Sequence, residues 1–366
     1  MSKKVILATG GYDHTVRFWE AASGVCFRTI QFPESHINRL VFSPDKVFLA
    51  VAANPRIVVF DALNNVASPV IGLEGHRGNV VSVGYEAFGS WLYSGSEDGT
   101  ICTWDPRSGK RSHVFCNRAG VTAVCLHPSQ RELISADCQG TVRTWDLIAN
   151  RLNRELKPQD DVPISTMALA ADGSLLSVCN HEGACYVWRV CQAGTGTGEA
   201  DAEFYELERL RDASPIPLTR SDSDLTEMQH WNRSPSRQRV VQRPGTPATE
   251  PVDFQPSTTW SAHTRYVLQS SFSPNGKMLA MALDSGFIRL WGVQRSVGAT
   301  WQQTQVLGRH QKWAWDLVFS DNSEFLFSCS SDRRACLWDL SSGSVIRTYE
   351  GHKLAVTALA VSVTTL

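Results

Sequence analysis

The stretch "SGSEDGTICTWD", Ser94 to Asp105, ends in a tryptophan and an aspartate that follow a short polar turn. It returns with changes as "TGGYDHTVRFWE" at residues 9–20 and as "SCSSDRRACLWD" at residues 328–339. Weaker copies read "AANPRIVVFD", "SADCQGTVRTWD", "VCNHEGACYVW" and "MALDSGFIRLW". A phrase that recurs along a chain indicates a repeat architecture, so its period decides the fold.

The aromatic residue near the end of each phrase measures this period. Successive aromatic residues lie 41, 44, 41, 43, 103 and 47 positions apart, at Trp19, Phe60, Trp104, Trp145, Trp188, Trp291 and Trp338. All gaps but one fit a repeat of about 40–45 residues, the length of a four-stranded propeller blade. Within each repeat, short apolar runs alternate with Gly, Asp, Asn and Ser-Pro turn signals. The sequence therefore predicts an all-β fold, a seven-bladed WD-repeat β-propeller over residues 1–366.

The two chain ends must share a blade if the number is seven. The N-terminal segments "KVILATGG" and "TVRFWE" lack an innermost strand, and "GHKLAVTALAV" near the C-terminus has no blade of its own. We expect this C-terminal strand to complete the first blade, because closure removes two exposed strand edges at once.

The long gap between Trp188 and Trp291 contains residues 191–256, which are rich in Pro, Ser, Thr, Gly and charge. Because they show no strand and turn rhythm, we interpret them as a disordered insertion between the last two strands of blade 5. Its Ser-Pro and Thr-Pro pairs make Ser214, Ser234 and Thr246 candidate phosphorylation sites. A solvated spacer without a regulatory role is the alternative.

Three blades carry the same four side chains. Each set has a hydroxyl ten positions before the tryptophan, an aspartate six before it, and a histidine ahead of the innermost strand. The sets are His352, Thr9, Asp13 and Trp19; His76, Ser94, Asp98 and Trp104; and His310, Ser328, Asp332 and Trp338. We expect each set to form a chain from aspartate to histidine to hydroxyl to indole N–H, which satisfies its buried polar groups.

A Ser-His-Asp set also invites a hydrolase interpretation. A catalytic triad needs one copy in one cleft, whereas a structural network can repeat, so three copies favour a structural role and no enzyme activity. The other blades have Asn54, Gln139, Glu182 and Ser285 at the aspartate position, and we expect these blades to rely more on packing.

The composition argues against nucleic-acid and membrane binding. The net charge of −1 gives no basic field, and no apolar run approaches the about 20 residues of a membrane span. The first residues contain too few apolar side chains for a signal peptide. The ten cysteines are scattered without a C-x-x-C or paired His/Cys motif. We therefore expect a soluble intracellular protein with reduced thiols and with no metal, cofactor or small-molecule substrate.

Two tryptophans in "HQKWAWDLVF", Trp313 and Trp315, stand outside the repeated phrase. Residues just before the innermost strands ring the top mouth of the central channel; these are His36, Asn79, Gly120, Pro163, Tyr266, Trp313 and Ala355. Aromatic residues from neighbouring blades at a rim are typical of a protein-binding hot spot. Because alternate strand residues share a face, Trp315 is expected to point the same way as Trp313, either toward a partner or as a wedge between blades.

Three phrases carry a more specific resemblance: "VILATGGYDHTVRFWEAASG", "AHTRYVLQSSFSPN" and "KWAWDLVFS". They resemble the WD-repeat subunit of the target of rapamycin (TOR) kinase complexes, the G-protein-β-subunit-like protein family. The resemblance runs along all seven blades and fails in the insertion.

This resemblance implies a non-catalytic scaffold subunit that binds and stabilises the TOR kinase domain in both TOR complexes and supports nutrient and growth signalling. The top face would grip an insertion in the C-lobe of the kinase domain and, through the kinase, join the other subunits. The implied location is cytoplasmic, with peripheral association to lysosomal, vacuolar or other endomembranes through the complex. The matching positions are His36, Asn38, Tyr266, Trp313 and Trp315, with Asn79 as a further candidate on the same ring. His36 stands where a polar amide is expected.

Other classes of function compete with this one. "TWDPRSG", with Trp104, Asp105 and Arg107, resembles the WDxR box of cullin-4 ubiquitin ligase substrate receptors, although the box overlaps ordinary WD repeats. An enzyme acting in the channel would need a ligand cluster or a unique carboxylate pair, which the sequence lacks. A heterotrimeric G-protein β role would need N-terminal coiled-coil heptads, which are also lacking.

Overall fold

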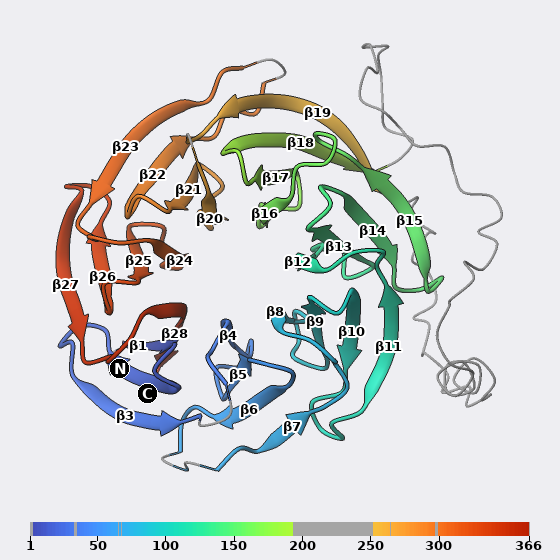
Figure 1. The fold of residues 1–366 in the computed structure, drawn as a ribbon. Helices are drawn as coiled ribbons and strands as arrows, with labels where there is room; N and C mark the ends of the chain where they lie inside the picture. The colour runs from blue at the N-terminus through green and yellow to red at the C-terminus, as the bar shows by residue number, and fades with distance from the viewer. Residues whose placement is uncertain are drawn as a thin grey trace.

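The computed structural model describes residues 3–32, 35–64, 66, 68–192, 252–263, 265–296 and 299–365. These residues form seven four-stranded sheets, arranged as blades around a central channel (Figure 1). No described residue is helical. The predicted seven-bladed WD-repeat β-propeller is confirmed.

Blade 1 is built from both ends of the chain, in the strand order β28-β1-β2-β3. Its strands are β1 (Lys3–Gly11), β2 (Thr15–Glu20), β3 (Cys26–Gln31) and β28 (Val356–Thr365). β1 pairs antiparallel with β28 along its whole length, and Figure 1 shows both termini in this blade. Closure of the ring by the C-terminal strand is confirmed.

Each of the other six blades uses four consecutive strands, from innermost to outermost. Blade 2 has β4 (Arg39–Phe42), β5 (Phe48–Ala52), β6 (Ile57–Asp61) and β7 (Ile71–Leu73). Blade 3 has β8 (Val80–Tyr85), β9 (Leu92–Ser96), β10 (Thr100–Trp104) and β11 (Arg111–Cys116). Blade 4 has β12 (Val121–Leu126), β13 (Glu132–Asp137), β14 (Val142–Asp146) and β15 (Arg151–Leu156). Blade 6 has β20 (Val267–Phe272), β21 (Met278–Leu283), β22 (Phe287–Gly292) and β23 (Gln302–Gly308). Blade 7 has β24 (Ala314–Phe319), β25 (Phe325–Ser330), β26 (Arg334–Asp339) and β27 (Ser344–Glu350).

Blade 5 has β16 (Ile164–Leu169), β17 (Leu175–Asn180), β18 (Ala184–Gln192) and β19 (Val252–Ser261). β18 and β19 remain paired as far as Gln192 and Val252, so residues 191–192 and 252–256, expected in the insertion, belong to strands instead. Backbone pairing extends these strands beyond the apolar phrase, because the ladder satisfies main-chain groups whatever the side chains are. Residues 193–251, including Ser214, Ser234 and Thr246, lie outside the described residues.

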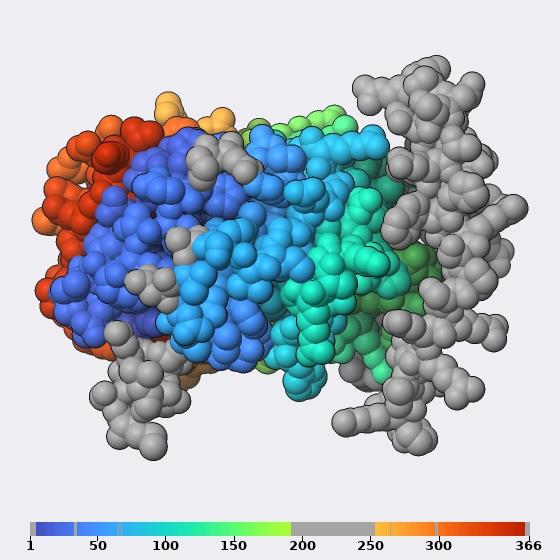
Figure 2. Space-filling model, turned by 90° about the horizontal axis from the view of Figure 1, so that it is seen from below, coloured from blue at the N-terminus to red at the C-terminus, as the bar shows by residue number. Residues whose placement is uncertain are grey.

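The hydrophobic core lies between neighbouring blades rather than on the axis. Between blades 1 and 2, for example, Phe18, Ile37 and Phe60 belong to one buried cluster. The tryptophans of the repeat close similar clusters, with Trp104 and Trp338 fully buried. Figure 2 views the ring from its edge, where the blades of the N-terminal third lie side by side. Because every blade contacts two neighbours, stability depends on an unbroken ring.

Six innermost strands carry one extra residue near their start. The register shifts there in β8, β12, β16, β20, β24 and, in blade 1, β28. The extra residues are Val81, Thr122, Ser165, Leu268, Trp315 and Thr357. A β-bulge turns a side chain away from the regular alternation of the strand. Simple alternation along the strand therefore does not predict the direction of a side chain at or just before these bulges.

Candidate protein-binding face and the polar networks that support it

The predicted polar set of blade 3 forms one hydrogen-bonded chain. Trp104 Nε1 donates to Ser94 Oγ at 2.8 Å, and His76 Nε2 lies 2.7 Å from the same oxygen. His76 Nδ1 lies 3.2 Å from Asp98 Oδ2. This series of hydrogen bonds joins the second and third strands of the blade to the connection that precedes its first strand, so it holds the top of the blade together.

Blades 1 and 7 repeat this arrangement. In blade 7, Trp338 Nε1 and His310 Nε2 each lie 2.8 Å from Ser328 Oγ, and His310 Nδ1 lies 2.9 Å from Asp332. Blade 1 builds the same chain from both chain ends. The four side chains there are Trp19, Thr9, His352 and Asp13, with successive distances of 2.8, 2.8 and 2.9 Å.

The three aspartates and His76 have pKa values shifted away from neutral pH. Burial by itself raises the pKa of Asp13, Asp98 and Asp332, but the hydrogen bond and charge of each histidine, together with further hydrogen bonds from the surrounding turn, lower it by more. Burial lowers the pKa of His76, whereas its hydrogen bonds to Asp98 and Cys102 raise it, to about 9. The hydroxyl oxygens are fully buried and already accept a bond from an indole N–H, so the geometry supports a structural role over a nucleophilic one.

Blade 4 has a different polar network. The Arg143 side chain, 5% exposed, donates to Asp137, to Glu155 at 2.5 Å and to Asn117 at 2.5 Å. Asp137 lies two residues before Gln139, which occupies the position of the aspartate of blades 1, 3 and 7. The cation that binds Asp137 is Arg143, in the third strand of the blade. The expectation that blade 4 relies on packing is therefore wrong.

Blades 5 and 6 also form their own polar bridges. In blade 5, Gln159 Oε1 accepts from Asn180 Nδ2 at 3.0 Å. In blade 6, Met281 occupies the hydroxyl position, and His263 Nε2 contacts Asp284 Oδ1 at 3.0 Å. These bridges use other residue types than the histidine and hydroxyl of blades 1, 3 and 7, so the repeated sequence pattern does not predict them.

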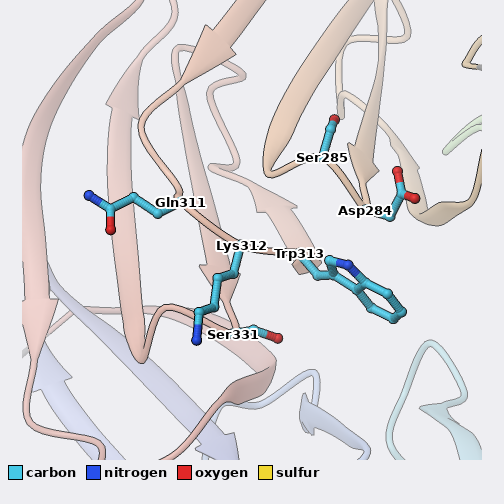
Figure 3. A pocket seen from close by; sticks show the side chains of 6 residues that line it. All are labelled: Asp284, Ser285, Gln311, Lys312, Trp313 and Ser331. Atoms are coloured by element: carbon cyan, nitrogen blue, oxygen red, sulfur yellow. The ribbon is translucent and has the colours of Figure 1, made fainter.

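Trp313 lies on the top face, in the connection between β23 and β24, and is 43% exposed. It lines a pocket of about 400 Å³ between blades 6 and 7, together with Asp284, Ser285, Gln311, Lys312 and Ser331. Figure 3 shows the indole extending from the connection on one side, while the Gln311 and Lys312 side chains point away from it. The face of this indole is therefore accessible to a binding partner.

A close approach between two loops shapes this pocket. Gly286, in the turn between β21 and β22, has a φ of 83°. A Cβ at Gly286 would lie 2.6 Å from the Lys312 carbonyl oxygen, too close for any other residue. This glycine therefore lets the turn of blade 6 pack directly against the connection that carries Trp313.

Trp315 supports Trp313 from below. It is the extra residue of the β24 bulge, so it does not simply continue the strand face on which the alternation places it. Its Nε1 donates to Ser331 Oγ at 2.6 Å, and its ring packs against the buried cluster between blades 7 and 1. The two indole centroids lie 5.4 Å apart. Of the two alternatives left open, this geometry describes a wedge, with one exposed indole resting on a half-buried one.

The other predicted rim residues lie in two groups. Tyr266, 40% exposed, makes a T-shaped contact with His181 at 5.1 Å on the blade 5 side. Asn38 Nδ2 donates to Asn79 Oδ1 at 2.5 Å and so joins blade 2 to blade 3. The structure thus brings Trp313 and Trp315 together and, separately, Asn38 and Asn79.

His36, which stands where an amide is expected, stacks on Tyr12 with ring centroids 4.8 Å apart. Sequence reasoning missed Tyr12, 40% exposed in the β1–β2 turn, and Leu354, 53% exposed in the β27–β28 connection. Leu354 directly precedes the ring position Ala355, which was an available signal. Tyr12 lies in the turn between the second and third strands of its blade, whereas the predicted rim residues came only from the connections before the innermost strands.

An ion pair between a buried aspartate and a partly exposed arginine spans the closing strand. Asp316 in β24 accepts from Arg39 Nη1 in β4 at 2.7 Å and from the Leu359 N–H of β28 at 3.0 Å. Gln269 in β20 places its amide oxygen 2.5 Å from the same Arg39 nitrogen. Burial raises the pKa of Asp316, although Arg39 and the backbone N–H groups of Leu359 and Leu317 oppose this effect. The aspartate within the apolar run "WAWDLVF" was the sequence signal for this contact.

The predicted ligase box lies on the opposite face. Trp104 is fully buried, and Asp105 accepts from the Arg107 N–H at 2.9 Å and from Ser108 Oγ at 2.8 Å within the β10–β11 turn. The Arg107 residue is exposed there. Asp105 therefore has a local turn-forming role that needs no partner.

Known proteins resemble the chain along almost its whole length. The family model "WD domain, G-beta repeat" matches residues 67–105, 109–146, 254–292 and 301–339. The target of rapamycin complex subunit wat1 of Schizosaccharomyces pombe is 35% identical over 358 residues, which are 98% of this chain and 96% of that protein. The chain belongs to the LST8 family of target of rapamycin complex subunits.

Two further relatives in the LST8 family come from a plant and a mammal. LST8-1 of Arabidopsis thaliana is 37% identical over 84% of this chain and 82% of its own length. LST8 of Bos taurus is 33% identical over 98% of this chain and 95% of its own length. Within the described part of this LST8-family chain, no three His, Cys, Asp or Glu side chains gather as a metal site. No helix among the described residues could cross a membrane.

Proposed function

We propose that this protein is a non-catalytic scaffold subunit of both TOR complexes, which binds and stabilises the TOR kinase domain through its top face. The observation that carries the proposal is the exposed indole of Trp313, held on Trp315 beside a pocket. An exposed, rigidly supported aromatic side chain at a rim is typical of a protein-binding hot spot. The LST8-family relatives, whose names describe TOR complex subunits, support a partner within a TOR complex, and we propose the kinase as that partner.

The proposal extends to the place of the protein in the cell. The top face would contact an insertion in the C-lobe of the kinase domain, with Tyr266, His36, Asn38 and Asn79 as further contact residues around Trp313. Through the kinase the protein would join the other subunits, support nutrient and growth signalling, and reach lysosomal, vacuolar or other endomembranes from the cytoplasm. Binding to one rim without covalent chemistry suits a chain whose histidine-and-hydroxyl networks are buried structural links.

Co-purification with the kinase tests this proposal. Trp313→Ala should lower recovery of the TOR kinase with the tagged protein by at least tenfold, since hot-spot truncations cost about 2 kcal/mol or more. Its melting temperature should stay nearly unchanged, because Trp313 is exposed. Trp315 is less suitable, since its half-buried ring also packs between blades.

Phe88, 87% exposed in the β8–β9 turn on the opposite face, offers a matched control. Phe88→Ala should leave kinase recovery unchanged. Full recovery of the kinase with Trp313→Ala would contradict the proposal. Loss of a cullin-4 adaptor with Arg107→Ala, and no kinase in any sample, would favour the ligase receptor alternative.

A further inference from the structure

Exposed apolar side chains on the top face continue from blade 7 across the closing blade. Leu354 follows Trp313 around the ring, in the connection that leads into β28. Tyr12 follows in the β1–β2 turn, and its ring stacks on His36 ahead of blade 2. The Tyr12 N–H donates to the Ala355 carbonyl at 2.9 Å, so the two chain ends form one continuous surface. We define the seam surface as Trp313, Leu354, Tyr12 and His36.

The charges around the seam surface are cationic. Lys312, Arg333 and Lys353 are exposed next to it, and none of them pairs with a carboxylate among the described residues. Three acids of the same rim, Asp284, Asp332 and Asp13, are bound to histidines. Their carboxylates are no more than 8% exposed. The free charge that a partner would meet here is therefore positive.

The opposite side of the rim differs in both respects. Three acids, Asp160, Asp161 and Glu182, outnumber one cation, Arg118, among the exposed charged residues on the top of blades 4 and 5. No large exposed hydrophobic residue lies in the described top-face connections of blades 3, 4 and 5. The top face is therefore divided into an apolar, cationic side at the seam and a polar, acidic side across the channel.

We propose that the seam surface binds an acidic segment of the partner protein in which Asp or Glu side chains flank exposed apolar ones. The inference rests on the proposed function, so the partner is the TOR kinase domain. Apolar contacts with Leu354 and Tyr12 supply burial, and the surrounding cations steer the acidic segment to this side of the ring. The cations also exclude a basic segment, because like charges at a rim are repulsive.

Charge reversal on the two sides of the rim tests the inference. Lys312→Glu with Lys353→Glu should reduce recovery of the full-length kinase about tenfold at low ionic strength, because rim charges set the association rate. The loss should shrink as NaCl is raised, since salt screens both the attraction and the repulsion. The matched control is Asp160→Lys with Asp161→Lys, which changes the net charge by the same magnitude with the opposite sign, on the acidic side, and should alter recovery less than twofold. Melting temperatures check that all variants are folded.

The outcomes separate this inference from the proposed function. If the lysine reversal has no effect while Trp313→Ala abolishes recovery, the kinase binds the top face but the acidic-segment inference is wrong. If neither variant lowers recovery, both fail. If the aspartate reversal weakens binding as much as the lysine reversal, the partner does not distinguish the two sides, and the inference is overturned. Leu354→Asp should weaken binding at high salt as well, because it removes an apolar contact.

Discussion

Blades 3 and 4 are neighbours with the same fold and different polar centres. In both, the tryptophan indole donates to a serine hydroxyl at 2.8 Å, from Trp104 to Ser94 and from Trp145 to Ser135. In blade 3 a histidine then connects the serine to an aspartate, whereas in blade 4 a buried arginine binds an aspartate and a glutamate. The blade thus requires a satisfied polar bridge at its top, and more than one set of side chains can provide it.

The two bridges differ in the number of carboxylates that would lose their cationic partner if the bridging side chain were removed. His76 contacts a single carboxylate, so its removal leaves only Asp98 without its cationic partner. Arg143 holds two carboxylates, and its removal leaves both without their cation in a site that is about nine-tenths buried. The difference between the blades should therefore appear in stability measurements.

The strongest way to break the comparison is to open the ring itself. Deletion of residues 353–366 removes β28 and, with it, the strand that covers β1. We expect the truncated chain to aggregate or to lose its cooperative melting transition, because all blades lose the closed ring. Calorimetry and size-exclusion chromatography measure this. A soluble truncated protein with one sharp transition would contradict the closure argument.

Within the intact ring, blade 4 should be the more sensitive to a single substitution. Arg143→Met should lower the free energy of unfolding by about 3–5 kcal/mol, the usual cost of breaking a buried ion pair. Denaturant unfolding measures the loss, and Arg151→Met, at an exposed position of the same blade, provides the control. Equal losses in the two variants would show that the network is not stabilising. Arg143→Met combined with Asp137→Asn should recover part of the loss, because fewer charges are left unpaired.

Much of the fold follows from the repeated phrase, but the blade 4 network does not. Arg17 and Arg143 occupy the same position in "TVRFWE" and "TVRTWD", and only Arg143 has carboxylate partners among the described residues. The difference depends on Asp137 and Glu155, which come from other strands. One repeated phrase does not predict such partners, because the pairing of strands in space decides which side chains meet.

The candidate site shows the same limit. The position of Trp313 and Tyr266 just before an innermost strand predicted that they lie on the top face, where both are exposed. It could not place Trp315, because a bulge depends on how β24 pairs with β25 and not on the sequence of β24 alone. The missed Tyr12 joins the rim through the connection between chain ends, a contact that exists only after closure.

A pH titration sharpens the comparison for blade 3. Burial raises the pKa of Asp98, but its bonds to His76, Thr100 and the Arg77 N–H lower it by more, so the folded value lies below the unfolded one. Its stabilising contribution is therefore present above pH about 4 and is lost as the pH falls further. Asp98→Asn should cost about 2 kcal/mol at pH 7 and flatten the decline in melting temperature below pH 4. An unchanged acid slope would contradict this assignment.

The smallest expected effect compares two indoles of the repeat. Trp104 Nε1 donates to Ser94, whereas the buried Trp291 Nε1 has no hydrogen-bond partner among the described residues. Substitution by phenylalanine removes the same ring volume at both sites, so the volume change largely cancels in the comparison. Trp104→Phe should therefore cost about 1 kcal/mol more than Trp291→Phe, the usual net value of one hydrogen bond.

Urea unfolding of the two variants beside the parent protein provides this difference directly. Trp104 and His76 bond the same Ser94 hydroxyl, so only the Trp104 variant disturbs the contact of His76. Amide hydrogen exchange should therefore become faster in blade 3 of that variant and stay unchanged in blade 6 of the Trp291 variant. Equal losses at the two sites would mean that packing alone holds the tryptophans in place. In that case the polar chains of blades 1, 3 and 7 would contribute specificity of blade geometry rather than stability, and blade 4 would be the exception in which buried polar contacts stabilise the ring.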